Sequence, residues 1–153
     1  MNVKNTVIEK QEEAFSFLKD NSLLEYRLVL ITDIIRKMKD SLNVAIAGAT
    51  GYIGLELIEI LSKHPKVKIL YLCANQSAGK SIYTFDKRIN LKNLPKISKI
   101  ENINWNKINI LFTSLPNGEA QKIAKIAPKS VKLIDLSADF RLDDFKLYKK
   151  WYG

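Results

Sequence analysis

The sequence has 153 residues, of which 46% are hydrophobic and 27% are charged. These values are typical of one folded domain, or of one domain with an appendage, and they exclude a wholly disordered chain, a collagen and a disulfide scaffold. Cys73 is the only cysteine, so no intrachain disulfide can form and a reducing compartment is favoured. The sequence shows neither a run of about 20 apolar residues nor a signal-peptide pattern. We therefore expect a cytoplasmic protein with no membrane partner.

The chain is strongly basic. It holds 25 lysines and arginines against 16 aspartates and glutamates, a formal net charge of +9. A basic surface attracts anions in general and does not select among nucleic acid, membrane and small phosphorylated ligands. The lysines between residues 87 and 107 have only Trp105 nearby to stack on bases, so we expect no nucleic-acid partner. The alternative is that the charge is only a solvated surface.

The first part of the chain, residues 1–40, carries two capping-box patterns at Thr6–Glu9 and Ser22–Glu25. In such a box the hydroxyl and the glutamate each accept a hydrogen bond from a backbone amide at the start of a helix. The two boxes predict helices at 7–19 and 23–39. Residues 1–40 are therefore expected to form an α-helical N-terminal extension.

The second of these helices has one apolar stripe, in which the residues follow at intervals of four and three. Its members are Leu24, Leu28, Ile31, Ile35 and Met38. The stripe must be buried against the following domain, the first helix or another chain. A further interpretation is that natural translation begins at Met38, so that residues 1–37 are not normally made.

After residue 40 the pattern changes to short apolar runs that alternate with helical periods. The runs predict strands at Leu42–Ala47, Val67–Cys73, Ile108–Thr113 and Val131–Leu136, a short strand at Ile97–Ile100, and helices at Leu55–Lys63 and 117–127. Strands that alternate with helices favour right-handed crossovers and a parallel sheet. We expect an α/β fold, a Rossmann-like doubly wound parallel sheet, in a dinucleotide-binding domain over residues 41–153.

The strongest local motif is the turn Gly48-Ala49-Thr50-Gly51-Tyr52-Ile53-Gly54, which joins the first predicted strand to the first predicted helix. The free amides and the dipole at the start of a helix favour an anion such as a diphosphate. Glycine is needed where the backbone meets the phosphate and where the helix packs on the strand. The expected diphosphate-binding residues are Gly48, Thr50, Gly51, Tyr52, Ile53 and Gly54. The alternative is a glycine turn used only for tight packing.

The end of the next strand indicates which coenzyme binds. NAD-binding domains usually place an acidic residue about 20 residues past the glycines, where it binds the ribose 2′-hydroxyl. The segment 73–77 contains no acid, and this favours NADP over NAD. We expect Asn75 and Ser77 near the adenosine ribose. The residues that could supply a countercharge for the 2′-phosphate are Lys80, Lys87 and Arg88.

The end of a later strand completes the predicted site, because ligands of doubly wound sheets lie at the carboxyl ends of the strands. The residues expected there are Ser114, Leu115, Pro116 and Asn117.

From Leu42 to Gly153 the sequence resembles the start of the N-acetyl-gamma-glutamyl-phosphate reductases, a family of the semialdehyde dehydrogenase superfamily. The segments that carry the resemblance are the glycine turn, Ser77-Ala78-Gly79-Lys80, Leu115-Pro116-Asn117-Gly118, Asp135-Leu136-Ser137-Ala138-Asp139-Phe140-Arg141-Leu142 and Lys150-Trp151-Tyr152-Gly153. The glycine turn is shared with aspartate-semialdehyde dehydrogenases, whereas the Asp135–Leu142 run and the Trp-Tyr-Gly ending are more specific. The resemblance covers about three quarters of the chain.

The resemblance implies an oxidoreductase of arginine biosynthesis. In this family a cysteine thiolate attacks the acyl phosphate of N-acetyl-glutamyl phosphate, phosphate leaves, and NADPH reduces the thioester to the semialdehyde. The family's nucleophile lies beyond the Trp-Tyr-Gly segment, so the chain is expected to be incomplete at its C-terminus, to supply only the cofactor-binding part, and to be inactive alone. The complete enzyme is expected to be a homo-oligomer acting on a small acyl phosphate.

No catalytic residue and no metal site are assigned. Cys73 ends a predicted buried strand and is expected to act as a small hydrophobe rather than a nucleophile. His64 precedes Pro65 at a helix end and is expected to be a surface or capping residue. Asn75 and Asn117 stand where relatives often have arginine and histidine. The resemblance also places Ser137, Asp139 and Arg141 in a loop near the active site, where an Asp–Arg pair that holds the loop is the structural alternative.

Two other interpretations remain open. One is a non-catalytic dinucleotide-binding or sensor module that docks a partner through its N-terminal helices. The other is a short-chain dehydrogenase, in which a Tyr-x-x-x-Lys pair acts together. Tyr83 and Lys87 have that spacing, but they lie in the irregular region 79–107.

Overall fold

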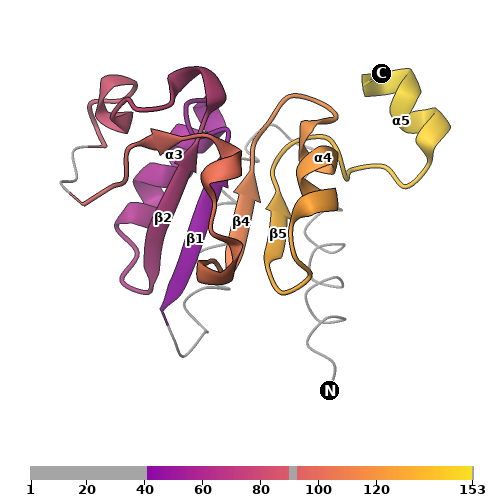
Figure 1. Ribbon diagram of the computed structural model, residues 1–153. Coiled ribbons are helices and arrows are strands. Elements are labelled where there is room, and N and C mark those ends of the chain that lie inside the picture. Colours follow the sequence, from indigo (N-terminus) through magenta and orange to yellow (C-terminus); the bar gives the residue numbers. More distant parts are fainter. Residues whose placement is uncertain (1–40, 90–92, 153) are drawn as a thin grey trace. The chain divides into compact units, whose positions relative to one another are not determined.

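The computed structural model of the protein describes residues 41–89 and 93–152. The helices predicted at 7–19 and 23–39 lie outside the described residues. Within them, five parallel strands form one sheet in the order β3-β2-β1-β4-β5 (Figure 1). The strands are β1 (Leu42–Ala47), β2 (Val67–Cys73), β3 (Ile97–Ser98), β4 (Ile110–Thr113) and β5 (Lys132–Asp135). This order confirms the Rossmann-like α/β fold, and it places a topological switch point between β1 and β4.

In the described part of the chain, three helices and four short 3-10 turns connect and follow these strands. The helices are α3 (Tyr52–Ser62), α4 (Glu119–Ile126) and α5 (Phe145–Tyr152), and the turns are η1 (Asn75–Ser77), η2 (Ile82–Thr84), η3 (Ile100–Asn102) and η4 (Trp105–Lys107). Helix α3 runs between β1 and β2, whereas α4 runs between β4 and β5 in the opposite direction along the sheet. Right-handed crossovers therefore place the two helices on opposite faces (Figure 1).

Both faces of the central strand β1 are covered. Val44 and Ile46 point to one face and Ala45 and Ala47 to the other, because side chains alternate along a strand. None of the four is more than 1% exposed. The face of the two alanines packs against Ile123 of α4 and against the connection between β3 and β4. This burial fixes the carboxyl end of β1, from which the glycine turn emerges.

The helix after the glycine turn begins earlier than predicted, at Tyr52 rather than Leu55. Gly51 is its N-cap, in an extended conformation and without a side-chain cap. The usual N-cap signal is a serine, threonine, aspartate or asparagine, and it is missing here. The second half of the glycine motif is therefore the first helical turn itself.

The other boundaries differ by a few residues, and one helix was not predicted. Strands β3, β4 and β5 and helix α4 are each shorter than the predicted segment by two or three residues. Helix α5 begins after Asp144, whose carboxylate accepts hydrogen bonds from the amides of Lys146 (2.7 Å) and Leu147 (3.1 Å). An aspartate before an amphipathic run is an N-terminal signal, and it could have revealed α5.

The environment of His64 corrects part of its expectation. Its side chain is buried, not on the surface. Its amide donates to the carbonyl of Leu61 (3.1 Å), and its Nδ1 accepts from the amide of Lys66 (3.1 Å). His64 therefore closes the end of α3, which agrees with a capping role. Within residues 41–89 and 93–152, no helix is both long enough and apolar enough to cross a membrane.

Candidate functional site

The glycine turn is held against the ends of two neighbouring strands. Gly48 adopts a φ of +85°, a left-handed conformation that favours glycine. The amides of Gly48 and Ala49 both donate to the carbonyl of Cys73 at the end of β2, at 2.9 and 3.1 Å. The amide of Gly51 turns back to the carbonyl of Gly48 at 3.1 Å. The turn therefore has a fixed shape at the carboxyl edge of the sheet.

Two of the three glycines are required by close packing. A Cβ on Gly48 would lie 2.1 Å from the carbonyl oxygen of Ser114, and a Cβ on Gly54 would lie 2.2 Å from the carbonyl oxygen of Gly48. No side chain fits at either position. Gly51 differs, because its Cβ would meet only the Gly48 oxygen at 3.4 Å, an ordinary contact. Packing therefore accounts for Gly48 and Gly54 and leaves the glycine at 51 unexplained.

The start of α3 is open to an anion. The first helical hydrogen bond runs from the amide of Leu55 to the carbonyl of Gly51 (2.9 Å), so the amides of Tyr52, Ile53 and Gly54 precede it. The N-cap contributes no side-chain hydrogen bond, and the first turn holds no acidic residue. Such amides carry partial positive charge. Nothing in the first turn neutralises that charge, and the geometry suits a phosphate or diphosphate.

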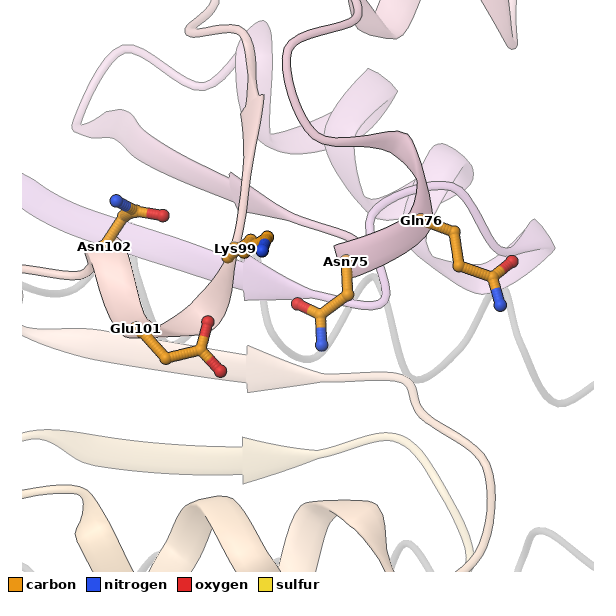
Figure 2. A pocket seen from close by; sticks show the side chains of 5 residues that line it. All are labelled: Asn75, Gln76, Lys99, Glu101 and Asn102. Atoms are coloured by element: carbon orange, nitrogen blue, oxygen red, sulfur yellow. The ribbon is translucent and has the colours of Figure 1, made fainter.

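A pocket of about 570 Å³ opens at the carboxyl ends of β2 and β3 (Figure 2). It is lined by Asn75, Gln76, Lys99, Glu101 and Asn102. Of the predicted ribose residues, Asn75 lines the pocket and Ser77 does not. The sequence did not reveal the contribution of η3, because it depends on the pairing of β3 with β2. The available signal was the short strand predicted at Ile97–Ile100.

The first residue of the segment that follows β4 lies against the glycine turn. Ser114 donates its amide to the carbonyl of Ala47 (2.9 Å) and its hydroxyl to the carbonyl of Gly48 (3.3 Å). Leu115 packs on the core. Pro116 and Asn117 are exposed, and the Asn117 amide group donates to the carbonyl of Tyr152 in α5 (3.3 Å). The structure therefore brings Ser114 to the glycine turn and directs Asn117 toward α5.

Two of the three predicted countercharges have other partners. Arg88 forms ion pairs with Asp86 (2.7 Å) and with Glu56 of α3. The ammonium group of Lys87 lies over the ring of Tyr83, 4.1 Å from its centroid. A Tyr-x-x-x-Lys pair of the short-chain dehydrogenase type needs the amine beside the hydroxyl, so this geometry does not support that interpretation. Lys80 is exposed.

Asp139 joins three segments beside the site. Its buried carboxylate accepts hydrogen bonds from the amides of Gly118 (2.6 Å) and Gln121 (3.0 Å) at the start of α4 and from the hydroxyl of Tyr148 in α5 (3.0 Å). Burial raises the pKa of Asp139, but these hydrogen bonds outweigh burial and hold the pKa below its usual range. The structural alternative, an Asp–Arg pair that holds the loop, is not formed, because the Arg141 Nε donates instead to the carbonyl of Ser137 (3.0 Å).

Comparison with known proteins identifies the family. The model of the semialdehyde dehydrogenase NAD-binding domain matches residues 43–152. The chain belongs to this family. The match covers the sheet from Asn43 onward and the glycine turn, and these position the candidate site.

The curated relatives of this semialdehyde dehydrogenase domain carry the name expected from the resemblance. N-acetyl-gamma-glutamyl-phosphate reductase of Ehrlichia chaffeensis is 42% identical over 117 residues, which are 76% of this chain and 34% of the relative. The reductase of Ehrlichia canis is 44% identical with the same coverage. That of Paracoccus denitrificans is 41% identical over 113 residues, 74% of this chain and 33% of the relative. The chain thus spans about a third of the length of these relatives.

Solved structures of semialdehyde dehydrogenases share the fold. Aspartate semialdehyde dehydrogenase II of Vibrio cholerae, complexed with ASA, gives a TM-score of 0.56 at 32% identity and covers 69% of this chain and 30% of that one. The Candida albicans enzyme, solved with NADP, gives 0.56 at 22% identity and covers 68% of this chain and 32% of that one. At 22% identity the second likeness shows the fold alone.

Cys73 of this domain lies in an environment that does not suit a nucleophile. It is 3% exposed, and its Sγ lies 3.8 Å from both the Ser98 hydroxyl and the Lys99 carbonyl oxygen. Burial raises the pKa of the Cys73 thiol to about 11. Nucleophilic cysteines need the thiolate, which this environment disfavours. The expectation of an inert, buried cysteine agrees with the structure.

Cys73 is therefore expected to be unreactive and dispensable for coenzyme binding. In the folded protein at pH 7.5, iodoacetamide should modify the thiol at least tenfold more slowly than it modifies free cysteine, because thiolate content and access are both low. Cys73→Ala should retain coenzyme affinity within about twofold, a change of about 0.4 kcal/mol. Labelling followed by mass spectrometry measures the rate. Rapid labelling, or loss of binding in the alanine variant, would contradict this assignment.

Proposed function

We propose that residues 41–153 form the NADP-binding part of an N-acetyl-gamma-glutamyl-phosphate reductase. The full reaction is the NADPH-dependent reduction of N-acetyl-glutamyl phosphate to its semialdehyde and phosphate, in arginine biosynthesis. The relatives named for this activity support the proposal. So does a glycine turn at the topological switch point of a doubly wound sheet, where dinucleotides bind.

The observation that carries the proposal is the glycine at the N-cap of α3. Neither its conformation nor its neighbours require glycine at Gly51. A serine, aspartate or asparagine would cap the helix better. Glycine leaves the amides of Tyr52, Ile53 and Gly54 without a side-chain cap, as a diphosphate needs. Use of the motif only for tight packing does not explain this choice.

The bound coenzyme would extend along the carboxyl edge of the sheet in both directions from the turn. The amides of Tyr52, Ile53 and Gly54, with Thr50, would hold the diphosphate. The adenosine would lie toward Asn75 and Ser77, because β2 ends beside the turn. The nicotinamide would lie toward the segment 114–117, on the β4 side of the switch point. When bound, NADPH would supply the hydride, and the chain would hold and orient the coenzyme.

The chain alone is expected to bind coenzyme without catalysing reduction. Reduction through a thioester needs a reactive cysteine, and the only cysteine of the sequence is the buried Cys73. In the complete enzyme we propose a cytoplasmic homo-oligomer that acts on a small acyl phosphate. The sensor alternative depends on docking by residues 1–40, which lie outside the described part of the structure.

Calorimetric titration and an activity assay together test this function. The purified chain is expected to bind NADPH at one site with a Kd in the range of about 1–100 µM, a span that typical substrate affinities include. With N-acetyl-glutamyl phosphate added, the NADPH absorbance at 340 nm should decrease no faster than it does without protein. Absence of binding to either nicotinamide coenzyme would overturn the proposal. Turnover by the chain alone would overturn the assignment of Cys73 as inert.

A further inference from the structure

The polar pocket at the end of β2 has two walls. One is η1, which follows β2, and the other is η3, which follows β3. The strands are paired in parallel through Leu72 with Ile97 and Cys73 with Ser98, so the two turns leave the same edge of the sheet. The amide of Ala74 donates to the carbonyl of Ser98 (3.1 Å). The relative position of the two walls is therefore set by the sheet itself.

The two walls carry different chemistry. From η1, Asn75 and Gln76 offer amide groups, which hydrogen-bond without net charge. The η3 wall and the residue before it place one cation, Lys99, and one carboxylate, Glu101, at the same opening. Figure 2 shows Lys99 between Asn75 and Asn102, with the carboxylate of Glu101 beside them. The pocket thus has both the group that binds a phosphate and the group that repels one.

These two charges are available to a ligand. Lys99 and Glu101 are both exposed, and the ion pairs found among residues 41–89 and 93–152 do not join them to each other. The backbone of η3 is held by a hydrogen bond from the amide of Asn102 to the carbonyl of Lys99 (3.2 Å). The side chains therefore extend from a fixed turn into an open pocket.

We propose that Lys99 and Glu101 determine the choice between NADP and NAD. Lys99 binds the 2′-phosphate of NADP, for which Asn75 supplies hydrogen bonds but no charge. Glu101 opposes that phosphate and lowers the preference for NADP. This inference rests on the proposed coenzyme function and adds the residues that set its selectivity. The sequence predicts a preference for NADP because segment 73–77 contains no acid. That segment is only one wall of the pocket, and η3 brings the carboxylate of Glu101 to the same opening.

The test compares NADP and NAD binding by calorimetry in four variants of the full chain. Lys99→Ala is expected to weaken NADP binding about tenfold and to leave NAD binding within twofold, since a charge-assisted hydrogen bond to phosphate is lost. Lys99→Arg should restore NADP affinity. Glu101→Gln should strengthen NADP binding about threefold to tenfold. Lys96→Ala removes the same charge at the opposite end of β3 and should change neither affinity.

Fragments of the coenzyme sharpen the test. Adenosine 2′,5′-bisphosphate and adenosine 5′-monophosphate differ only in the 2′-phosphate, so Lys99→Ala should weaken the first and spare the second. An equal loss for NADP and NAD in Lys99→Ala, or no loss for either, would overturn the proposal. Unchanged NADP affinity in Glu101→Gln would also contradict it. These outcomes differ from failure of the coenzyme function itself, in which the unmodified chain binds neither coenzyme.

Discussion

Gly51→Asp is expected to stabilise the domain and to remove coenzyme binding. Aspartate is a preferred N-cap, and its charge interacts favourably with the helix dipole, so the free energy of unfolding should rise by about 0.5–1 kcal/mol. The φ of −75° and the open surroundings of Gly51 accept the side chain without strain. The same carboxylate would occupy and repel the place of the diphosphate. NADPH affinity should fall at least about a hundredfold, or about 2.7 kcal/mol.

Gly51→Asn is the matched control for the charge. Asparagine caps a helix about as well as aspartate and has nearly the same shape, so it should give most of the gain in stability. Its effect on affinity should be smaller, because it competes for the amides without repelling phosphate. Thermal unfolding measures the stability and calorimetric titration the affinity. A Gly51→Asp variant that binds NADPH as the unmodified chain does would show that the diphosphate lies elsewhere.

Among the variants discussed, Asp139→Ala is expected to cause the largest decrease in the free energy of unfolding. The substitution leaves the amides of Gly118 and Gln121 and the hydroxyl of Tyr148 without their buried acceptor. Loss of a cap and of charge-assisted hydrogen bonds should lower the free energy of unfolding by about 3 kcal/mol. For a domain of this size the Tm should fall by at least about 10 °C.

The control for Asp139→Ala is Asp143→Ala. Asp143 is an exposed aspartate of the same segment, and its replacement should change stability by no more than about 0.5 kcal/mol. Equal Tm values for the two variants would contradict the role of Asp139. Asp139→Asn, which keeps one acceptor oxygen, should fall between the unmodified chain and Asp139→Ala.

The lowered pKa of Asp139 also predicts how stability depends on pH. A carboxyl whose pKa is lower in the folded chain than in the unfolded chain contributes its full stability above the unfolded pKa of about 3.9. That contribution is lost as the pH falls below this value and through the lowered folded pKa. The difference in stability between the unmodified chain and Asp139→Asn should therefore shrink below about pH 4. Denaturant unfolding between pH 3 and pH 7 measures it.

Much of the fold could be predicted because it depends on local patterns. The strands Leu42–Ala47 and Val67–Cys73 were predicted with the bounds that the structure gives, since buried parallel strands are continuous apolar runs. The start of α3 was placed too late because Gly51 lacks the side chain that normally marks an N-cap. The glycine at position 51 thus hides the start of α3 in the sequence, and the same glycine supports the proposed diphosphate binding.

The parts of the site that were missed depend on contacts between distant segments. Lys99 and Glu101 reach the pocket only because β3, a strand of two residues, pairs with β2. For Asp139 the local spacing offered only a pair with the nearby Arg141, as the structural alternative, but its partners are Gly118 and Gln121 at the start of α4 and Tyr148 on α5. Neither arrangement has a signature in local spacing. Both need the assembled sheet, which brings the carboxyl ends of separate strands together.

The most direct measurement of the central claim is amide chemical-shift mapping of the isotope-labelled chain during titration with NADP. We expect the amides of Gly51, Tyr52, Ile53 and Gly54 to shift most among residues 51–62 and to saturate with the calorimetric affinity. Asn75 and Ser114 should shift with them, on either side of the turn. Saturable binding that leaves these four amides unshifted, with the shift changes elsewhere on the chain, would contradict a diphosphate site at the start of α3.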